Sequence, residues 1–174
     1  MAIDTLTPAR LTVVHPGDGA SGELAPGVGV IFKIDGDAAS GRLSIVEHTF
    51  AVGALVPPHT HTLEDEYSIV VDGEIGFRSD DQEVVLSAGG YIVKPRAQVH
   101  AMWNAGSVPA RMIEVIAPAG FERFFHEFVE MTALGRPDPT DITRLADKYE
   151  LPFARPEWLP DVISRYALNP LPGA

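Results

Sequence analysis

The sequence predicts an all-β domain, an antiparallel sandwich or barrel, with α-helices at its C-terminal end. Up to about Ala117, short apolar runs alternate with turn residues at regular spacing, which is typical of this fold class. The 174 residues include 16 glycines and 15 prolines, a content that favours many short elements over a few long ones. After Ala119 the apolar residues repeat at helical spacing, so helices are expected to follow the strands.

The predicted strands are short apolar runs bounded by glycine, proline, aspartate or serine. They cover residues 11–14, 28–34, 43–50, 67–71, 74–78, 83–86, 91–93, 99–104 and 110–116. The dipeptide Asp72-Gly73 lies between two of these runs. It predicts a two-residue hairpin turn, because these residue types tolerate the positive φ angles of a type I′ turn.

Three helices are expected after the strands. The apolar stripe of the first comprises Phe121, Phe124, Phe125, Phe128 and Val129. We expect this stripe to pack on the core rather than to bind a cofactor. A second helix begins at Asp138-Pro139, since aspartate suits the N-cap and proline the first turn, and a short third helix follows Pro160. We assign residues 1–119 to the β domain with its N-terminal strands, and residues 120–174 to a helical extension packed on it within the same domain.

The composition excludes several classes of function. The chain has no cysteine, which excludes disulfides, thiolate metal sites and cysteine nucleophiles. Its 24 acidic residues against 13 lysines and arginines give a formal net charge of −11, which disfavours nucleic acid and anionic membranes as partners. No apolar run approaches the roughly 20 residues of a membrane-spanning helix, and the N-terminus lacks the features of a signal peptide. We therefore expect a soluble, cytoplasmic protein.

Residues 17–22 match the glycine spacing of a dinucleotide-binding loop. Such a loop requires a helix that starts within it, so that the helix N-terminus faces the pyrophosphate. The residues that follow include Pro26, Gly27 and Gly29, which disfavour a helix. We therefore expect a surface loop here and no nucleotide cofactor.

The most informative stretch holds His59 and His61, which two preceding prolines keep extended. Residues two apart on an extended chain point the same way, so both imidazoles can face one point. The stretch continues with Glu64, Asp65 and Glu66, and His100 begins a strand-like run farther along. Three imidazoles and one carboxylate would form a site for a divalent first-row metal. A pair of surface histidines is the alternative, and the spacing alone does not choose the carboxylate.

Two blocks of fixed spacing resemble the two motifs of the cupin superfamily. The first comprises Gly53, His59, His61, Glu66 and Gly73, and the second comprises Gly89, Pro95, Ala97, His100 and Asn104. The resemblance covers about residues 43–116 and implies a cupin-type jelly-roll β-barrel. It also implies that His59, His61, Glu66 and His100 are the metal ligands. Ala97 stands where the family usually has glycine, a difference that we expect to tighten a turn without touching a ligand.

The donor set also bears on the metal and on its chemistry. Six-coordinate iron, manganese, nickel or cobalt would keep two positions for substrate or dioxygen, whereas four-coordinate zinc, the alternative, would keep none. Glu66 is then either a plain ligand or a catalytic group that leaves the metal and accepts a proton.

A finer resemblance extends past the barrel. Residues 118–125, followed by Lys-Tyr-Glu-Leu at 148–151, are similar to the tail of single-domain cupins related to flavonol (quercetin) 2,3-dioxygenases. The resemblance implies a metal-dependent dioxygenase that acts on a small organic, aromatic or enolic substrate, with dioxygen as co-substrate. The alternatives are a metal-dependent isomerase, lyase or decarboxylase, and a non-catalytic module that binds a small molecule or metal.

Strand alternation assigns further residues to the substrate pocket. If His100 faces inward, then Met102 and Asn104 do so too, while Ala101 and Trp103 face away. Phe50 and Phe77 are further candidates for the pocket wall. The partner expected besides the substrate is a second copy of the chain, a homodimer formed through the β-rich N-terminal segment.

Other polar residues in the strands receive weaker assignments. Either Glu47 or His48 must face inward, because they are neighbours on one predicted strand. We expect His48 to be structural or exposed, with substrate contact as the alternative. His15 and His126 are expected to face solvent, and the sequence leaves the roles of Glu47 and Glu114 open.

Overall fold

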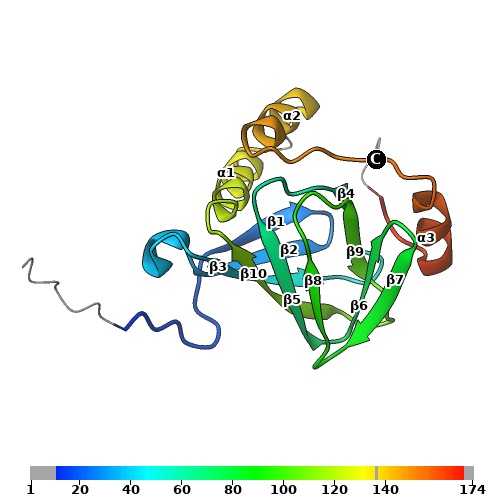
Figure 1. Cartoon of the computed structure of the whole chain (residues 1–174), viewed down its shortest axis with the longest axis horizontal. Helices are drawn as coiled ribbons and strands as arrows, with labels where there is room; N and C mark the ends of the chain where they lie inside the picture. The colour runs from blue at the N-terminus through cyan, green and yellow to red at the C-terminus, as the bar shows by residue number, and fades with distance from the viewer. Residues whose placement is uncertain (1–10, 136, 171–174) are drawn as a thin grey trace, which may run out of the picture.

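Ten strands and three helices make up the part of the chain that the computed structural model describes, residues 11–135 and 137–170 (Figure 1). The strands are β1 (Ser21–Ala25), β2 (Val28–Ile34), β3 (Ser44–Phe50), β4 (Leu55–His59), β5 (Asp65–Asp72), β6 (Glu74–Ser79), β7 (Gln82–Ser87), β8 (Tyr91–Lys94), β9 (His100–Asn104) and β10 (Ala110–Ala117). The helices are α1 (Glu122–Ala133), α2 (Pro139–Lys148) and α3 (Leu159–Tyr166), and a short 3₁₀ turn covers Gly36–Ala39.

The strands form two antiparallel sheets that face each other (Figure 1), and apolar side chains of both sheets pack between them. One sheet has six strands in the order β1-β2-β3-β10-β5-β8, and the other has four in the order β4-β9-β6-β7. The all-β prediction is confirmed, but the predicted closed barrel is wrong. Among the described residues, the edge strands of one sheet do not pair with those of the other, so the architecture is a β-sandwich.

The strands predicted from Val28 onward are confirmed, with ends that differ by at most two residues. The strand predicted at residues 11–14 is wrong, because this segment has no strand to pair with and Leu11 is 94% exposed. Strands β1 and β4 were not predicted as strands. The first begins inside the glycine-rich loop, and the second contains Pro57 and Pro58.

The turn at Asp72-Gly73 differs from its prediction. It links β5 of one sheet to β6 of the other rather than two paired strands. Gly73 has a φ of 68°, whereas Asp72 does not have the positive φ that a type I′ turn requires. A Cβ at position 73 would lie 2.7 Å from the Cβ of Ala110. Glycine is therefore needed at position 73 both for the positive φ angle and for the close approach of the segment that contains Ala110.

Strand β9 divides the molecule into an interior and an outer layer. Met102 faces the interior, where it packs with Phe50, Phe77 and other apolar residues of both sheets. Trp103 faces the opposite side and is fully buried against Val162 of α3. The predicted facing of these two β9 residues is confirmed. Each face of the four-stranded sheet is therefore covered, one by the second sheet and the other by α3.

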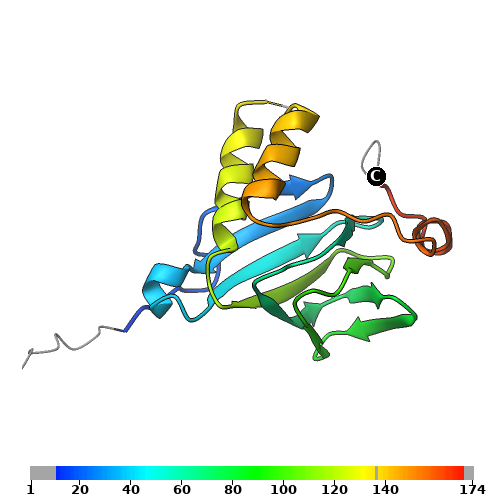
Figure 2. The same cartoon turned by 45° about the horizontal axis from the view of Figure 1, so that its top comes forward.

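The helices cover two different parts of the sandwich (Figure 2). Helix α1 contacts β1 and α2, so this pair of helices lies over one end of the six-stranded sheet. The predicted cap of α2 is confirmed, because the carboxylate of Asp138 accepts a hydrogen bond from the backbone N–H of Thr140 at 2.7 Å. The two predicted segments, residues 1–119 and 120–174, each include residues outside the described part of the chain. These are residues 1–10, 136 and 171–174.

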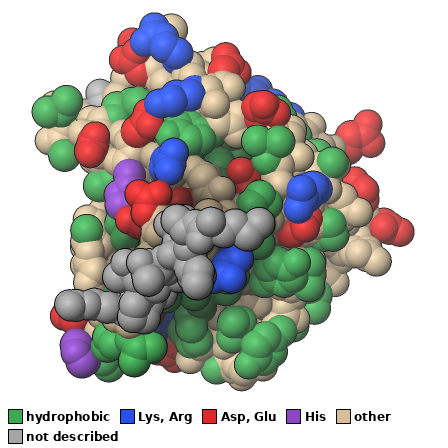
Figure 3. Space-filling view, turned by 60° about the vertical axis from the view of Figure 1, so that its left-hand side comes forward, with side chains coloured by type: hydrophobic (Ala, Val, Ile, Leu, Met, Phe, Trp, Pro, Cys, Tyr) green, Lys and Arg blue, Asp and Glu red, His purple; other side chains and the backbone are tan. Residues whose placement is uncertain are grey.

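Charged side chains of both signs are interspersed over the face shown in Figure 3. Some form ion pairs between elements, as between Arg165 of α3 and Glu83 of β7, whose charged atoms are 2.7 Å apart. In the described residues, no helix has both the length and the apolar character that crossing a membrane requires.

Asn104 ties the end of β9 to its surroundings. Its buried amide donates hydrogen bonds to the carbonyl oxygens of Phe50 and Val108 and accepts one from the N–H of Gly106. We expect Asn104→Ala to lower the free energy of unfolding by about 1–3 kcal/mol, because buried polar groups lose their partners. Urea denaturation measures the change, with exposed Ser107→Ala of the same loop as the control. Equal stabilities for the two variants would contradict this structural role.

Candidate metal centre

Four side chains from separate elements converge in the interior. His59 ends β4, His61 follows in the next loop, Glu66 lies in β5 and His100 begins β9. All four are buried, and one ligand atom from each lies within 4.8 Å of the others. The Nε2 atom of His61 is 3.1 Å from both His59 Nε2 and Glu66 Oε1, and His100 Nε2 is 3.2 Å from Glu66 Oε2. The structure thus brings together the four residues that the cupin resemblance implies as metal ligands.

Backbone pairing on both sides holds the histidine segment in place. In the four-stranded sheet, His59 of β4 is the register partner of His100 of β9. On its other side, the segment meets the chain between α2 and α3, where the N–H of Thr60 donates to the carbonyl of Pro152 at 3.1 Å. The extended conformation predicted for this stretch is confirmed, and the C-terminal extension contributes to it.

The orientation of two imidazoles fits a metal. Nδ1 of His59 is 2.8 Å from the carbonyl oxygen of Pro57, and Nδ1 of His100 is 3.1 Å from that of Gln98. A carbonyl only accepts, so each Nδ1 carries the proton and each neutral ring presents the lone pair of Nε2 to the cluster. This arrangement is typical of metal-ligating histidines. The Nε2 atom of His100 is buried without a hydrogen-bond partner among the described residues, as expected of an atom that serves a cation.

Burial also favours the form of histidine that binds metals. Desolvation holds the pKa of His59 well below its usual value, and it lowers the pKa of His100 as well. Both rings are therefore neutral at pH 7, which leaves a lone pair for a metal ion. The residues present thus fit a divalent transition metal, and the donor set agrees with the predicted cofactor without choosing among the metals.

A buried lysine, missed in the sequence analysis, lies behind the cluster. The Nζ atom of Lys94 is 2.8 Å from Glu66 Oε2 and 2.9 Å from Glu114 Oε2, and it is 3.7 Å from the sulfur of Met102. The other oxygen of Glu114 accepts a hydrogen bond from Ser68. The only sequence pattern that could have indicated the inward position of Lys94 is strand alternation, because Lys94 lies on the same face of its strand as Ile92.

The two carboxylates beside Lys94 differ in their electrostatics. Burial raises the pKa of Glu66, but attraction to His61 and Lys94 lowers it more, so its pKa lies well below the usual value. For Glu114 burial outweighs Lys94 and raises the pKa to about 7. A carboxylate held ionised inside the protein is suited to binding a cation, which supports the role of Glu66 as a ligand over that of a proton acceptor.

The neighbouring carboxylates have other roles. Asp65 forms a two-point ion pair with Arg96 at 2.9 and 3.1 Å, which holds the pKa of Asp65 at about 2. Glu64 is buried rather than solvated, and its Oε2 atom has no hydrogen-bond partner among the described residues. The expectation for Ala97 also needs correction. Its φ is 63°, which explains the glycine usual in the family, and its N–H donates to the carbonyl of the ligand His61 at 2.7 Å.

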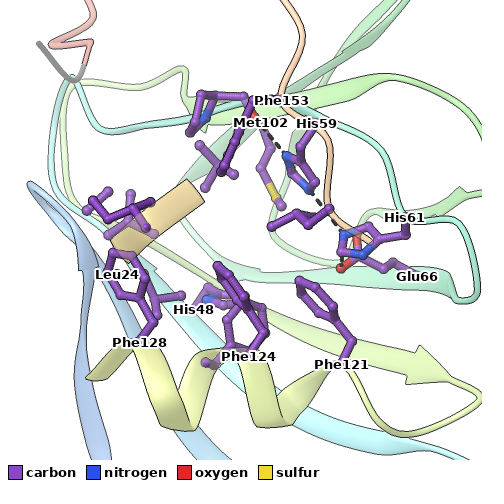
Figure 4. Close-up of a pocket in the computed structure, with 17 residues that line it drawn as sticks. Leu24, His48, His59, His61, Glu66, Met102, Phe121, Phe124, Phe128 and Phe153 are labelled. Carbon is purple, nitrogen blue, oxygen red and sulfur yellow. Dashed lines mark hydrogen bonds and ion pairs between the residues drawn. The ribbon is translucent and has the colours of Figure 1, made fainter. Parts of the chain in front are cut away.

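An apolar cavity of about 110 Å³ opens onto three of the four candidate ligands (Figure 4). It is lined by His59, His61 and Glu66, by His48, Met102, Leu24, Ala25, Val28, Val56 and Pro57, by Phe121, Phe124, Phe125 and Phe128, and by Ile142, Leu151 and Phe153. The phenylalanines of α1 point into it, and the ring of Phe121 is 4.2 Å from that of His61. Their predicted core packing is confirmed, and the same stripe also lines the site, which the helical spacing alone does not indicate.

The predicted pocket residues fall into three groups. Met102 lines the cavity, as expected. Phe77 lines a second cavity of about 600 Å³, of mixed polar and apolar lining, on the side of His100 and Lys94. Phe50 and Asn104 were wrongly placed on the wall, since Phe50 is part of the core between the sheets and Asn104 has all its partners in the backbone.

The remaining polar residues of the β domain are now placed. His48 faces inward and is buried, which excludes exposure and leaves the expected structural role and its alternative, substrate contact, whereas Glu47 faces outward and pairs with Arg111 at 2.9 Å. His15 is exposed, and half-exposed His126 stacks on Phe32.

Comparison with known proteins agrees with this geometry. Residues 46–116 match the model of the family described as the cupin domain. This segment of the chain is therefore similar to a cupin domain. This domain includes all four candidate metal ligands as well as Lys94 and Glu114. It ends before α1, so the helices that complete the cavity lie outside the matched segment.

Individual relatives match this chain over part of its length and part of their own. Germin-like protein subfamily T member 2 of Arabidopsis thaliana is 40% identical over 76 residues, which cover 41% of this chain and 34% of that protein. The tetracenomycin polyketide synthase protein TcmJ of Streptomyces glaucescens is 35% identical over 81 residues, which cover 47% of this chain and 53% of that protein. The chain thus spans about a third to a half of the length of these relatives.

A solved structure shares the cupin fold. The polyketide cyclase RemF from Streptomyces resistomycificus superposes with a TM-score of 0.54 at 22% sequence identity. The superposition covers 62% of this chain and 80% of that one. At this identity, the likeness supports the fold alone.

Removal of a candidate ligand should abolish metal binding. We expect His59→Ala and His100→Ala of the metal-loaded protein to retain far less than one equivalent of iron, manganese, nickel, cobalt or zinc, measured by elemental analysis after desalting. His126→Ala, which removes a histidine outside the cluster, should retain as much metal as the unaltered chain. A full equivalent in both ligand variants would contradict the assignment.

Removal of the buried lysine should destabilise the fold strongly. Lys94→Met leaves Glu66 and Glu114 buried without their cation, so we expect the free energy of unfolding of the metal-free protein to fall by about 3–5 kcal/mol. Lys148→Met breaks only an exposed pair with Glu127 and should cost less than about 1 kcal/mol. Urea denaturation measures both values. A loss at position 94 no larger than that at position 148 would show that the buried pairs are not structural.

Proposed function

We propose that this chain is a metal-dependent cupin enzyme that acts on a ring-sized, largely apolar organic substrate. The observation that supports this proposal is that an apolar cavity ends on three candidate metal ligands, His59, His61 and Glu66. A divalent cation bound there would polarise a substrate oxygen as a Lewis acid. The phenylalanines of α1 would hold the apolar part of the substrate and exclude water.

Within this class, we propose a dioxygenase. The cluster of three imidazoles and one carboxylate suits a six-coordinate, redox-active metal that keeps two positions for substrate and dioxygen. Both oxygen atoms of dioxygen would enter the organic product, so the reaction needs no external reductant. A flavonol-cleaving activity is the narrower form of this proposal. A cavity of about 110 Å³ is smaller than the apolar cavity of about 150 Å³ that binds benzene, so it disfavours a whole flavonol, and a one-ring enolic substrate would have to displace side chains of the wall or extend out of the cavity.

A second candidate is a reaction on the same class of substrate without dioxygen. The curated relative TcmJ is described as a polyketide synthase protein, and the fold neighbour RemF as a polyketide cyclase. These descriptions favour a ring closure, and the same metal site would serve the predicted isomerase, lyase or decarboxylase chemistry. In each case Glu66, ion-paired with Lys94, would act as a fixed anionic ligand.

Oxygen consumption separates the candidates. The chain is loaded in turn with iron, manganese, nickel, cobalt and zinc, and offered a panel of enolic and phenolic one-ring compounds together with a flavonol. We expect one dioxygen to be consumed per substrate with a redox-active metal, and none with zinc or with His100→Ala, measured by an oxygen electrode and mass spectrometry. Conversion without oxygen uptake would contradict the dioxygenase and support the second candidate. No conversion by any loaded form would contradict both and leave a binding protein.

A further inference from the structure

His48 is the one polar residue of the apolar cavity that does not belong to the metal cluster, among the described residues that line it. It lies in the middle of β3, between β2 and β10, and is 3% exposed. Figure 4 shows it among the phenylalanines of α1, apart from His59, His61 and Glu66. The cavity therefore has two separate polar features, the metal cluster and a single imidazole.

The contacts of His48 fix what its ring offers to a ligand. Nδ1 is 3.1 Å from the carbonyl oxygen of Gly29, which can only accept, so Nδ1 carries a proton. The ring of Phe125 packs edge-on against the imidazole at 5.3 Å between centroids. Burial lowers the pKa of His48 to about 4, which keeps the ring neutral at pH 7. The remaining nitrogen, Nε2, is therefore a hydrogen-bond acceptor, and it has no partner among the described residues.

We propose that His48 Nε2 is a specificity-determining subsite that accepts a hydrogen bond from a hydroxyl or N–H group of the ligand. This inference rests on the proposed function, because it assigns the end of the substrate that points away from the metal cluster. The ligand would be a ring-sized apolar molecule with an oxygen atom at one end and a hydrogen-bond donor at the other. A second anionic group is disfavoured, since the part of the cavity around His48 offers an acceptor and no cation.

The size of the expected effect follows from the chemistry of the subsite. A hydrogen bond between neutral groups in a protein interior contributes enough to change an affinity by about threefold to tenfold. A ligand without the donor leaves Nε2 unpaired, whereas one with the donor satisfies it. The signature is therefore a ratio of affinities for two ligands of the same shape that differ only in the donor.

Phenol and toluene are the probes, since they are similar in size and only phenol has a donor. Their dissociation constants are measured by calorimetry on the whole chain, both metal-free and loaded with zinc, so that no turnover occurs. We expect the preference for phenol over toluene to fall about threefold to tenfold in His48→Phe. The preference for phenol should stay unchanged in His126→Phe. This variant carries the same type of substitution at a histidine that lies outside the cavity and stacks on Phe32.

A direct measurement on the unaltered chain does not depend on the folding of any variant. In protein labelled with ¹⁵N-histidine, phenol should shift the resonance of the unprotonated Nε2 of His48, and toluene should not. An unchanged resonance, an equal phenol preference in His48→Phe, or no binding of either probe would each overturn the subsite. Loss of metal binding with an intact phenol response would instead overturn the proposed function alone.

Discussion

The ion pairs of Lys94 with Glu66 and Glu114 are the constraint on which the site depends. Three ionisable groups lie in an apolar interior, where an unpaired charge costs several kcal/mol. They come from β8, β5 and β10, which are neighbours in the six-stranded sheet. A slip of one residue in either pairing would turn a charge to the opposite face. The register that places Glu66 opposite Lys94, and Ser68 opposite Glu114, thus also fixes where the cluster lies.

The cupin domain and the extension contribute different parts of the site. The matched segment supplies the candidate ligands, the buried charges and His48. The extension supplies most of the aromatic wall through α1 and through the chain after α2, where Phe153 bridges to His59. The candidate metal ligands thus lie in the part of the chain that matches the family model, and most of the aromatic wall lies outside it. For the same reason, partial matches to relatives are stronger evidence for the type of domain than for any one reaction.

Local patterns made the strands and the four clustered residues predictable. The spacing of His59 and His61 on an extended segment, and the alternation along β9, are visible within a few residues of sequence. Lys94 was not predictable in this way, because its partners Glu66 and Glu114 are distant in sequence and meet it only through strand order. The same reason applies to the turn at Asp72-Gly73. Its residues suit a hairpin, but the approach of Ala110 and the change of sheet decide its actual form.

Asn104 and Met102 show the limit of alternation as a guide to function. Both face inward from β9, but only Met102 reaches the cavity. The amide of Asn104 instead forms hydrogen bonds with backbone groups of adjacent segments of the protein. Facing a sheet interior is therefore necessary for contact with a ligand but not sufficient. Among inward polar groups, those with an unused donor or acceptor are the better candidates.

His48 meets this stricter condition, and its place in the cavity explains why it matters for selectivity. An apolar wall does not distinguish two ligands of the same shape that differ only in a hydrogen-bond donor. A buried acceptor that only one of them satisfies separates their affinities by about threefold to tenfold. In a cavity whose other walls are aromatic and aliphatic, one neutral imidazole opposite the metal cluster can thus decide which of several similar rings is bound and in which direction it lies.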